Sequence, residues 1–156
     1  ANMADVVRLE SPDRILHLGD MARDAEDLAR AFPQIPVTYV PGNCDGRRPD
    51  LPEERIFTLD GCRILMTHGH AYHVKMGIGL AVRAAREAGA HLLCFGHTHE
   101  ALCTFENGMW IVNPGSVGTF GPHAYGTRDR KVVRKGRDHD AAGSGRGEHQ
   151  YGVWYL

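Results

Sequence analysis

Leu92-Leu93-Cys94-Phe95-Gly96-His97-Thr98-His99 is the stretch that decides the fold. Its first four residues form a short apolar run bounded by Gly89 and Gly96, which is typical of a buried strand. The two histidines therefore stand where a strand ends and a loop begins, the place where ligands usually bind in a parallel sheet. Two imidazoles one residue apart can point to two neighbouring positions, which suits a pair of metal ions. His-x-His alone is a weak signal, so the assignment depends on the rest of the chain.

Four further predicted strands end in small polar motifs. These motifs are Gly19-Asp20, Gly42-Asn43-Cys44-Asp45, Thr67-His68-Gly69-His70 and Asn113-Pro114-Gly115-Ser116. Their glycines allow tight turns and close approach of the backbone to an ion or a phosphate. Asp, Asn and His together supply the mixed oxygen and nitrogen ligands that suit Mn²⁺, Fe, Ni²⁺ or Zn²⁺. The sequence has no clustered cysteine ligands, which argues against a structural zinc site.

Length and composition indicate one globular domain over residues 1–156. Hydrophobic residues make up 42% of the chain and charged residues 24%, and the net charge is -1. That charge predicts no overall attraction to nucleic acid or to a membrane surface. No apolar run approaches the roughly 20 residues of a membrane span, and no signal peptide is visible. Four cysteines without a Cys-x-x-Cys pair indicate a reducing, cytoplasmic location.

Helices and strands alternate along the chain. We expect helices over 2–10, 24–32 and 77–88, strands over 15–18, 37–40, 56–59, 62–66, 92–95, 102–105 and 109–112, and a last strand over 151–156. Asp24 can cap the second helix, and Gly89 can end the third. Asp60-Gly61 and Asn107-Gly108 each predict a hairpin. Residues 127–150 are rich in Gly, Asp, His and Ser and are expected to form a flexible loop. The pattern is that of an α/β protein with a mixed sheet.

Together the five strand-end motifs resemble those of the calcineurin-like metallophosphoesterases, and specifically their small phosphodiesterase branch. The motifs occur in the family's order and span residues 13–120. The resemblance implies a four-layer α-β-β-α sandwich with mixed sheets. It also implies a hydrolase that cleaves a phosphodiester by two-metal hydroxide attack, with Mn²⁺ as the expected metal and Ni²⁺, Fe or Zn²⁺ as alternatives.

The resemblance assigns the metal ligands by position. Asp20 matches the carboxylate that bridges both ions. Asn43, His68 and His97 match ligands of one ion, and His99 matches a ligand of the other. The alternative for Asp20 is a helix N-cap, since Asp is a favoured capping residue.

The remaining motif positions give the expected catalytic residues Asn43, Asp45 and His70 and the expected substrate-binding residues Asn43, Cys44 and His70. Asp45 would orient a neighbouring group, and His70 would contact the phosphate. Cys44 occupies the position at which many relatives place a catalytic histidine, so general-acid catalysis is not expected there.

The family begins with a strand ending in Asp-x-His, and nothing in this chain matches it. The first strand predicted here corresponds to the family's second, so the sequence is either truncated or a natural variant that keeps one ion. The ion position formed by Asp20, Asn43, His68 and His97 is complete, whereas the other retains only Asp20 and His99. We therefore expect one well-formed metal site, poor hydrolysis, and an unpaired strand edge that could favour a homo-oligomer.

A binding scaffold is the alternative to an enzyme. The retromer subunit of the same fold resembles this sequence in its motifs and works through protein contacts. A scaffold would keep a large exposed apolar patch, and the sequence shows no clear excess of such residues. The basic residues of 128–137 are read as a solvated loop, so no nucleic-acid partner is expected. The expected ligand is a small phosphodiester or nucleotide-like molecule.

Overall fold

The computed structural model describes residues 3–116 of the chain. Its elements are α1 (Met3–Glu10), β1 (Ile15–His17), α2 (Ala22–Ala31), β2 (Val37–Tyr39), β3 (Glu54–Leu59), β4 (Cys62–Thr67), the short 3-10 helix η1 (His70–Tyr72), α3 (Gly79–Glu87), β5 (Leu92–Phe95), β6 (Leu102–Glu106) and β7 (Met109–Asn113). The flexible loop expected over 127–150 and the strand expected over 151–156 lie outside the described residues.

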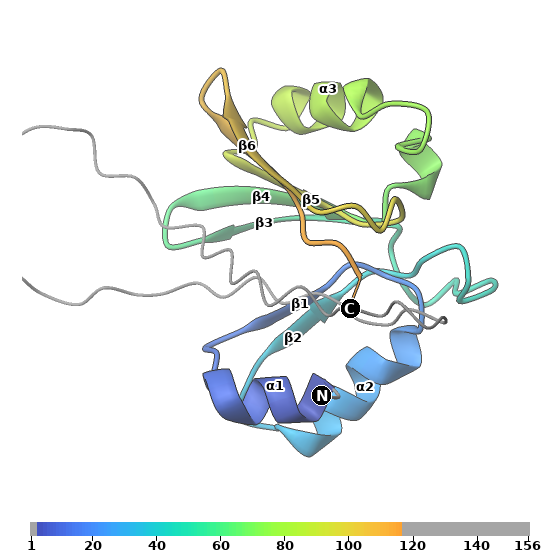
Figure 1. The fold of residues 1–156 in the computed structure, drawn as a ribbon, viewed down its shortest axis with the longest axis vertical. Helices are drawn as coiled ribbons and strands as arrows, with labels where there is room; N and C mark the ends of the chain where they lie inside the picture. Colours follow the sequence, from blue (N-terminus) through green and yellow to red (C-terminus); the bar gives the residue numbers. More distant parts are fainter. Residues whose placement is uncertain (1–2, 117–156) are drawn as a thin grey trace, which may run out of the picture.

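The strands form two sheets. β1 and β2 pair in parallel, and the larger sheet has the order β3-β4-β5-β7-β6. Within the larger sheet β4, β5 and β7 run parallel, while β3 and β6 are antiparallel edge strands. Figure 1 shows α1 and α2 on the outer face of the small sheet and α3 on the outer face of the large sheet. The expected α-β-β-α layering with mixed sheets is therefore confirmed.

Apolar residues fill the spaces between these layers. Between the two sheets, Leu16 and Leu18 pack with Met66 and Cys94. β5, the central strand of the large sheet, is buried along its whole length, because each of its faces meets a neighbouring layer.

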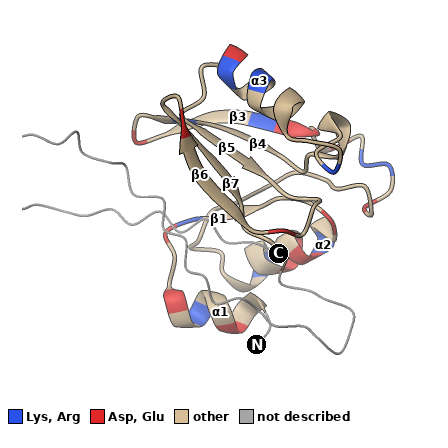
Figure 2. Ribbon diagram, turned by 45° about the horizontal axis from the view of Figure 1, so that its top comes forward, with Lys and Arg blue, Asp and Glu red and all other residues tan. Residues whose placement is uncertain are grey.

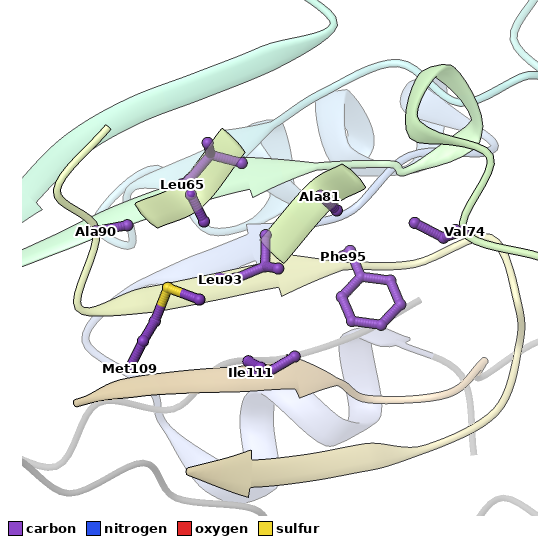
Figure 3. Packing of buried hydrophobic residues seen from close by; sticks show 9 residues of the cluster. Leu65, Val74, Ala81, Ala90, Leu93, Phe95, Met109 and Ile111 are labelled. Atoms are coloured by element: carbon purple, nitrogen blue, oxygen red, sulfur yellow. The ribbon is translucent and has the colours of Figure 1, made fainter. Parts of the chain in front are cut away.

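A second core joins the large sheet to α3. Leu65, Leu93 and Ile111 pack in one cluster with Ala81 and Ala85 of the helix. Figure 3 shows the side chains of Leu65, Leu93 and Ile111 on the α3 side of the sheet. The small alanine side chains let α3 lie close to the sheet. A third core, formed by Val7, Ile15, Leu28 and Phe32, joins the small sheet to α1 and α2.

Both predicted hairpins are present. Asp60 and Gly61 have φ values of 44° and 78°, and Asn107 and Gly108 have φ values of 47° and 79°. These left-handed pairs match the turn that the Asx-Gly dipeptide favours. Charged residues of both signs lie along the outer helices (Figure 2). No helix in the described part of the chain is long and apolar enough to cross a bilayer.

The predicted cap of α2 was wrong. The residue before the helix is Met21, with φ 58° and ψ 51°, and it makes no side-chain capping bond. Asp24 lies inside the first turn. The backbone N–H of Ala22 instead donates to Oδ1 of Asp45 at 2.6 Å, so this helix end is capped by a residue 23 positions later. The capping alternative for Asp20 is also wrong, because that carboxylate accepts from another loop, as described next.

Candidate metal centre

Loops from both sheets meet at one end of the sandwich. Asp20 follows β1, and its Oδ1 accepts a hydrogen bond of 2.9 Å from the backbone N–H of Cys44, in the loop after β2. His68 follows β4 and His97 follows β5. Because β1 is parallel to β2 and β4 is parallel to β5, the four loops leave from carboxyl ends of strands, where ligands gather in α/β sheets.

Two glycines allow this convergence. A Cβ on Gly42 would lie 2.2 Å from both the backbone N and Oδ1 of Asp20. A Cβ on Gly19 would lie 2.7 Å from Nδ1 of His68. Asp20 and His97 themselves adopt left-handed backbone, with φ values of 56° and 67°. Such strained conformations in non-glycine residues cluster at functional sites.

His68 lies at the centre of the cluster. Its Nε2 is 3.1 Å from Oδ1 of Asn43, 3.1 Å from Nδ1 of His97 and 3.5 Å from Oδ1 of Asp20. Its Nδ1 is 2.7 Å from the backbone carbonyl of Leu18. A carbonyl oxygen only accepts, so Nδ1 carries the proton and donates it to Leu18. Nε2 of the neutral ring is then an acceptor, and its lone pair faces the other three atoms.

Nε2 of His68 and the three atoms around it are better suited to binding a shared cation than to hydrogen bonding with one another. The oxygens of Asn43 and Asp20 and Nε2 of His68 are all acceptors, and only Nδ1 of His97 could bring a proton among them. Ligand atoms about 2.1 Å from one ion lie about 3.0 to 3.4 Å apart in octahedral or tetrahedral geometry, which matches the two shorter contacts. No three His, Cys, Asp or Glu side chains in residues 3–116 are already arranged to hold an ion. Binding would therefore use the Asn43 oxygen and a rotation of the Asp20 carboxylate.

The protonation states also suit metal binding. Burial lowers the pKa of His68, although its bond to Leu18 and the charge of Asp20 oppose the shift. Burial, with the nearby His68 ring, lowers the pKa of His97 to about 4. Burial disfavours ionisation of Asp20, but the Cys44 N–H and the histidines outweigh it and hold the pKa of Asp20 below its usual value. At neutral pH both rings are neutral and the carboxylate is ionised, the states in which these groups bind metals.

Asp45 supports the loop after β2. Its Oδ2 accepts from the backbone N–H of Gly42 at 2.7 Å, and its Oδ1 accepts from Ala22 at 2.6 Å. The carboxylate thus ties the loop that carries Asn43 to the start of α2. Asp45 therefore orients the backbone on both sides of the cluster, and the catalytic role expected of it stays a prediction.

A family model described as the calcineurin-like phosphoesterase superfamily domain matches residues 1–130. The chain belongs to this family. It is 35% identical over 106 residues to a probable metallophosphoesterase, YsnB, of Bacillus subtilis, covering 67% of this chain and 59% of that protein. The chain thus spans well under two thirds of the relative's length.

Solved structures show the same fold at low sequence identity. Vps29 of Entamoeba histolytica complexed with Zn²⁺ aligns with a TM-score of 0.63 and 22% identity, covering 78% of this chain and 68% of that one. A structure described as a novel archaeal phosphodiesterase aligns with a TM-score of 0.51 and 21% identity, covering 71% and 72% of the two chains. The metallophosphoesterase fold predicted from the motifs is therefore confirmed.

The structure brings most of the expected residues of the metallophosphoesterase site together. His70 joins the cluster, with its ring centroid 5.3 Å from that of His68 and 6.1 Å from that of His97. Cys44 is exposed beside the cluster, and its Sγ is 3.5 Å from Nδ2 of Asn43. His99 is exposed, and no contact between it and the cluster is found in the described residues.

Sequence reasoning assigned no role to Asn113, which proves to hold the His97 loop. Its side chain is fully buried. Nδ2 donates to the carbonyl of Gly96 at 3.0 Å and to Oγ1 of Thr98 at 2.9 Å, one residue on either side of His97. Oδ1 accepts from the N–H of Gly115 at 2.9 Å. An Asn before Pro-Gly signals such a side-chain turn, but its bonds to a different strand end leave no sequence signature.

Proposed function

We propose that this chain is the metal-binding part of a phosphodiesterase that hydrolyses a small phosphodiester or nucleotide-like substrate. The observation that carries the proposal is the convergence of acceptor atoms around Nε2 of His68. Asn43, His97 and Asp20 each place an acceptor-capable atom within 3.5 Å of it, with too few protons to satisfy them all. Mn²⁺ is the metal we propose, because the donors mix nitrogen and oxygen.

When bound, divalent ions lower the pKa of water and neutralise charge on phosphoryl oxygens. The residues of the chain would supply the remaining functions. His70 is the proposed phosphate contact, and its Nδ1 is buried with no hydrogen-bond partner among the described residues. The negative charge of Asp20 raises the pKa of the Cys44 thiol, so Cys44 stays neutral and does not repel an anionic substrate.

We propose that the cluster around His68 binds one ion. His99 is the proposed ligand of a second ion, and its exposed position leaves it free to turn towards the site. A neutral thiol at position 44 is a poor general acid, which favours a leaving group that departs without protonation. This supports a diester with an acidic leaving group over an alkyl phosphomonoester.

Metal content and hydrolysis test the proposal together. Elemental analysis of protein purified without a histidine tag would give the number of ions per chain. Hydrolysis of bis-p-nitrophenyl phosphate and p-nitrophenyl phosphate with added Mn²⁺ would give the activity and the preference between diester and monoester. Binding of at least one ion, with faster diester hydrolysis, is the expected result.

A matched pair of variants locates the site. His97→Ala removes a proposed ligand, whereas His91→Ala removes an exposed histidine at the other end of β5. The first variant is expected to lose metal and activity and the second to keep both. A folded protein that binds no Mn²⁺, or metal binding that survives His97→Ala, would contradict the proposal and favour the scaffold alternative.

A further inference from the structure

A second cavity lies along an edge of the sandwich, away from the candidate metal centre. In the described part of the chain β2 pairs only with β1, and β3 pairs only with β4, so each of the two strands has a free edge. Residues of both strands line a cavity of about 510 Å³, a volume typical of pockets for small organic ligands. Its lining consists of Arg14, Thr38, Pro52 and residues 54–59, and none of these is a proposed metal ligand.

Two arginines of this lining lie on the side of their sheets that faces the other sheet. Leu16 of β1 belongs to the core between the sheets, so Arg14, two residues earlier, lies on the same face. Phe57 of β3 packs against that core from the large sheet, and Arg55, again two residues earlier, shares its face. Both arginine side chains therefore enter the cavity from opposite sheets.

Hydrogen bonds fix the direction of both arginine side chains. Nη1 of Arg14 donates to Oγ1 of Thr38 at 3.2 Å, and Nε of Arg55 donates to the backbone carbonyl of Tyr39 at 2.7 Å. A guanidinium has five N–H donors, and no further hydrogen bond of either group is found within residues 3–116. Both residues are half-buried, so most of their donors are available while the side chains are already oriented.

The positive charges of the two arginines are not neutralised by the protein. Neither Arg14 nor Arg55 forms an ion pair within the described residues. Glu54 is the acidic residue of the lining, but its Oε2 accepts a hydrogen bond from the hydroxyl of Tyr72, which packs on the α3 side of the large sheet. As the strand neighbour of Arg55, Glu54 points to the opposite face. The cavity thus presents two uncompensated cations, which attract an anion.

We propose that this cavity binds a small organic phosphate monoester, with Arg14 and Arg55 holding the phosphate and Phe57 and Leu59 packing against the organic part. The planar fork of a guanidinium matches a pair of phosphate oxygens. A monoester phosphate carries nearly two negative charges at neutral pH, which matches two guanidinium groups, whereas a carboxylate brings one. The inference is independent of the proposed function. If both hold, the cavity binds the product class of phosphodiester hydrolysis at a place separate from the metal centre.

Calorimetric titration with phenyl phosphate tests the inference, and EDTA in the buffer removes any contribution from the metal centre. The chain is expected to bind one molecule of phenyl phosphate, and to bind benzoate, which has the same ring and a single charge, about tenfold more weakly. Arg14→Gln and Arg55→Lys are each expected to weaken phenyl phosphate binding about tenfold, since lysine lacks the fork. Arg83→Gln removes a positive charge from α3, where it pairs with Glu87, and is expected to leave binding unchanged.

Arginine labelling gives a readout that needs no variant. Phenyl phosphate is expected to slow the modification of Arg14 and Arg55 by phenylglyoxal, measured by peptide mass spectrometry, and to leave the modification of Arg83 unchanged, with Mn²⁺ or with EDTA. Protection of neither Arg14 nor Arg55 would overturn the inference. Binding of phenyl phosphate that requires Mn²⁺ would also overturn it, because the ligand would then occupy the metal centre. Equal affinity for benzoate and phenyl phosphate would overturn the assignment to a phosphate monoester.

Discussion

Nδ1 of His68 donates a 2.7 Å hydrogen bond to the backbone carbonyl of Leu18 across the space between the two sheets. His68 follows β4 of the large sheet, and Leu18 follows β1 of the small sheet. This one contact joins the two halves of the sandwich at the candidate site. It also fixes the ring tautomer, because the proton must lie on Nδ1, and so leaves Nε2 free to bind a metal.

Two substitutions of His68 separate these roles. Asn places its amide N–H₂ near the position of Nδ1 and can keep the bond to Leu18, but it has no atom near Nε2. We expect His68→Asn to fold as the unmodified chain does and to bind Mn²⁺ at least about a hundredfold more weakly, as loss of a ligand predicts. Equilibrium dialysis with Mn²⁺ and urea denaturation of the metal-free proteins would measure both quantities.

His68→Gln is the complementary variant. Gln reaches towards the position of Nε2 but loses the donor to Leu18, so the metal-free chain is expected to be less stable by about 1 to 2 kcal/mol. If His68→Asn kept the affinity for Mn²⁺, Nε2 could not be the ligand atom.

Position 42 must be a glycine because Asp20 lies too close to leave room for a side chain. An alanine Cβ at this position would lie 2.2 Å from the backbone N of Asp20, and backbone cannot move aside cheaply. We expect Gly42→Ala to destabilise the chain by about 2 to 3 kcal/mol and to weaken metal binding. Gly79→Ala is the control, because nothing lies within 4 Å of its Cβ position, and its effect is expected to stay below about 1 kcal/mol. Equal melting curves for Gly42→Ala and the unmodified chain would show that the loops do not pack as described.

Asn113 offers a test of the support beneath His97. Asn113→Asp keeps the acceptor for Gly115 but loses both donations, to Gly96 and Thr98, and buries a charge. We expect a loss of about 3 kcal/mol in the free energy of unfolding and at least tenfold weaker Mn²⁺ binding. Urea denaturation and metal titration check the two effects. A variant that lost stability but bound Mn²⁺ normally would show that the position of His97 is set by other contacts.

Local patterns predicted much of this fold because each acted within a few residues. The hairpin turns at Asp60-Gly61 and Asn107-Gly108 follow from the left-handed conformations that Asx and Gly accept. The apolar run at 92–95 needs burial on both faces, which only a central strand provides. His68 and His97 meet because they follow β4 and β5, which are neighbouring parallel strands. Asn43 follows β2 of the small sheet, so its contact with His68 depends also on how the two sheets stack.

The contacts that the sequence did not reveal join distant segments. Asp24 has the right residue type and place for a helix cap, yet Asp45 caps α2 from the loop after β2. The anchoring of the His97 loop by Asn113 joins the ends of two strands. The first contact depends on how the loop after β2 packs against α2, and the second depends on which strands pair in the large sheet. Local propensity carries no information about either.

The lowered pKa of His97 gives a last prediction, on acid stability. An unfolded histidine takes up a proton below about pH 6.5, whereas His97 in the folded, metal-free chain does so only near pH 4. Between these values the unfolded state binds more protons, so the free energy of unfolding falls as the pH is lowered. Burial lowers the pKa of His17 and His68 as well, and both add to the same loss of stability.

Urea denaturation of the EDTA-treated chain at steps between pH 7 and 4.5 is expected to show this decline in the free energy of unfolding. His97→Asn removes one of the three groups and is expected to flatten it, and a decline that is unchanged in His97→Asn would mean that the ring is readily protonated in the folded chain.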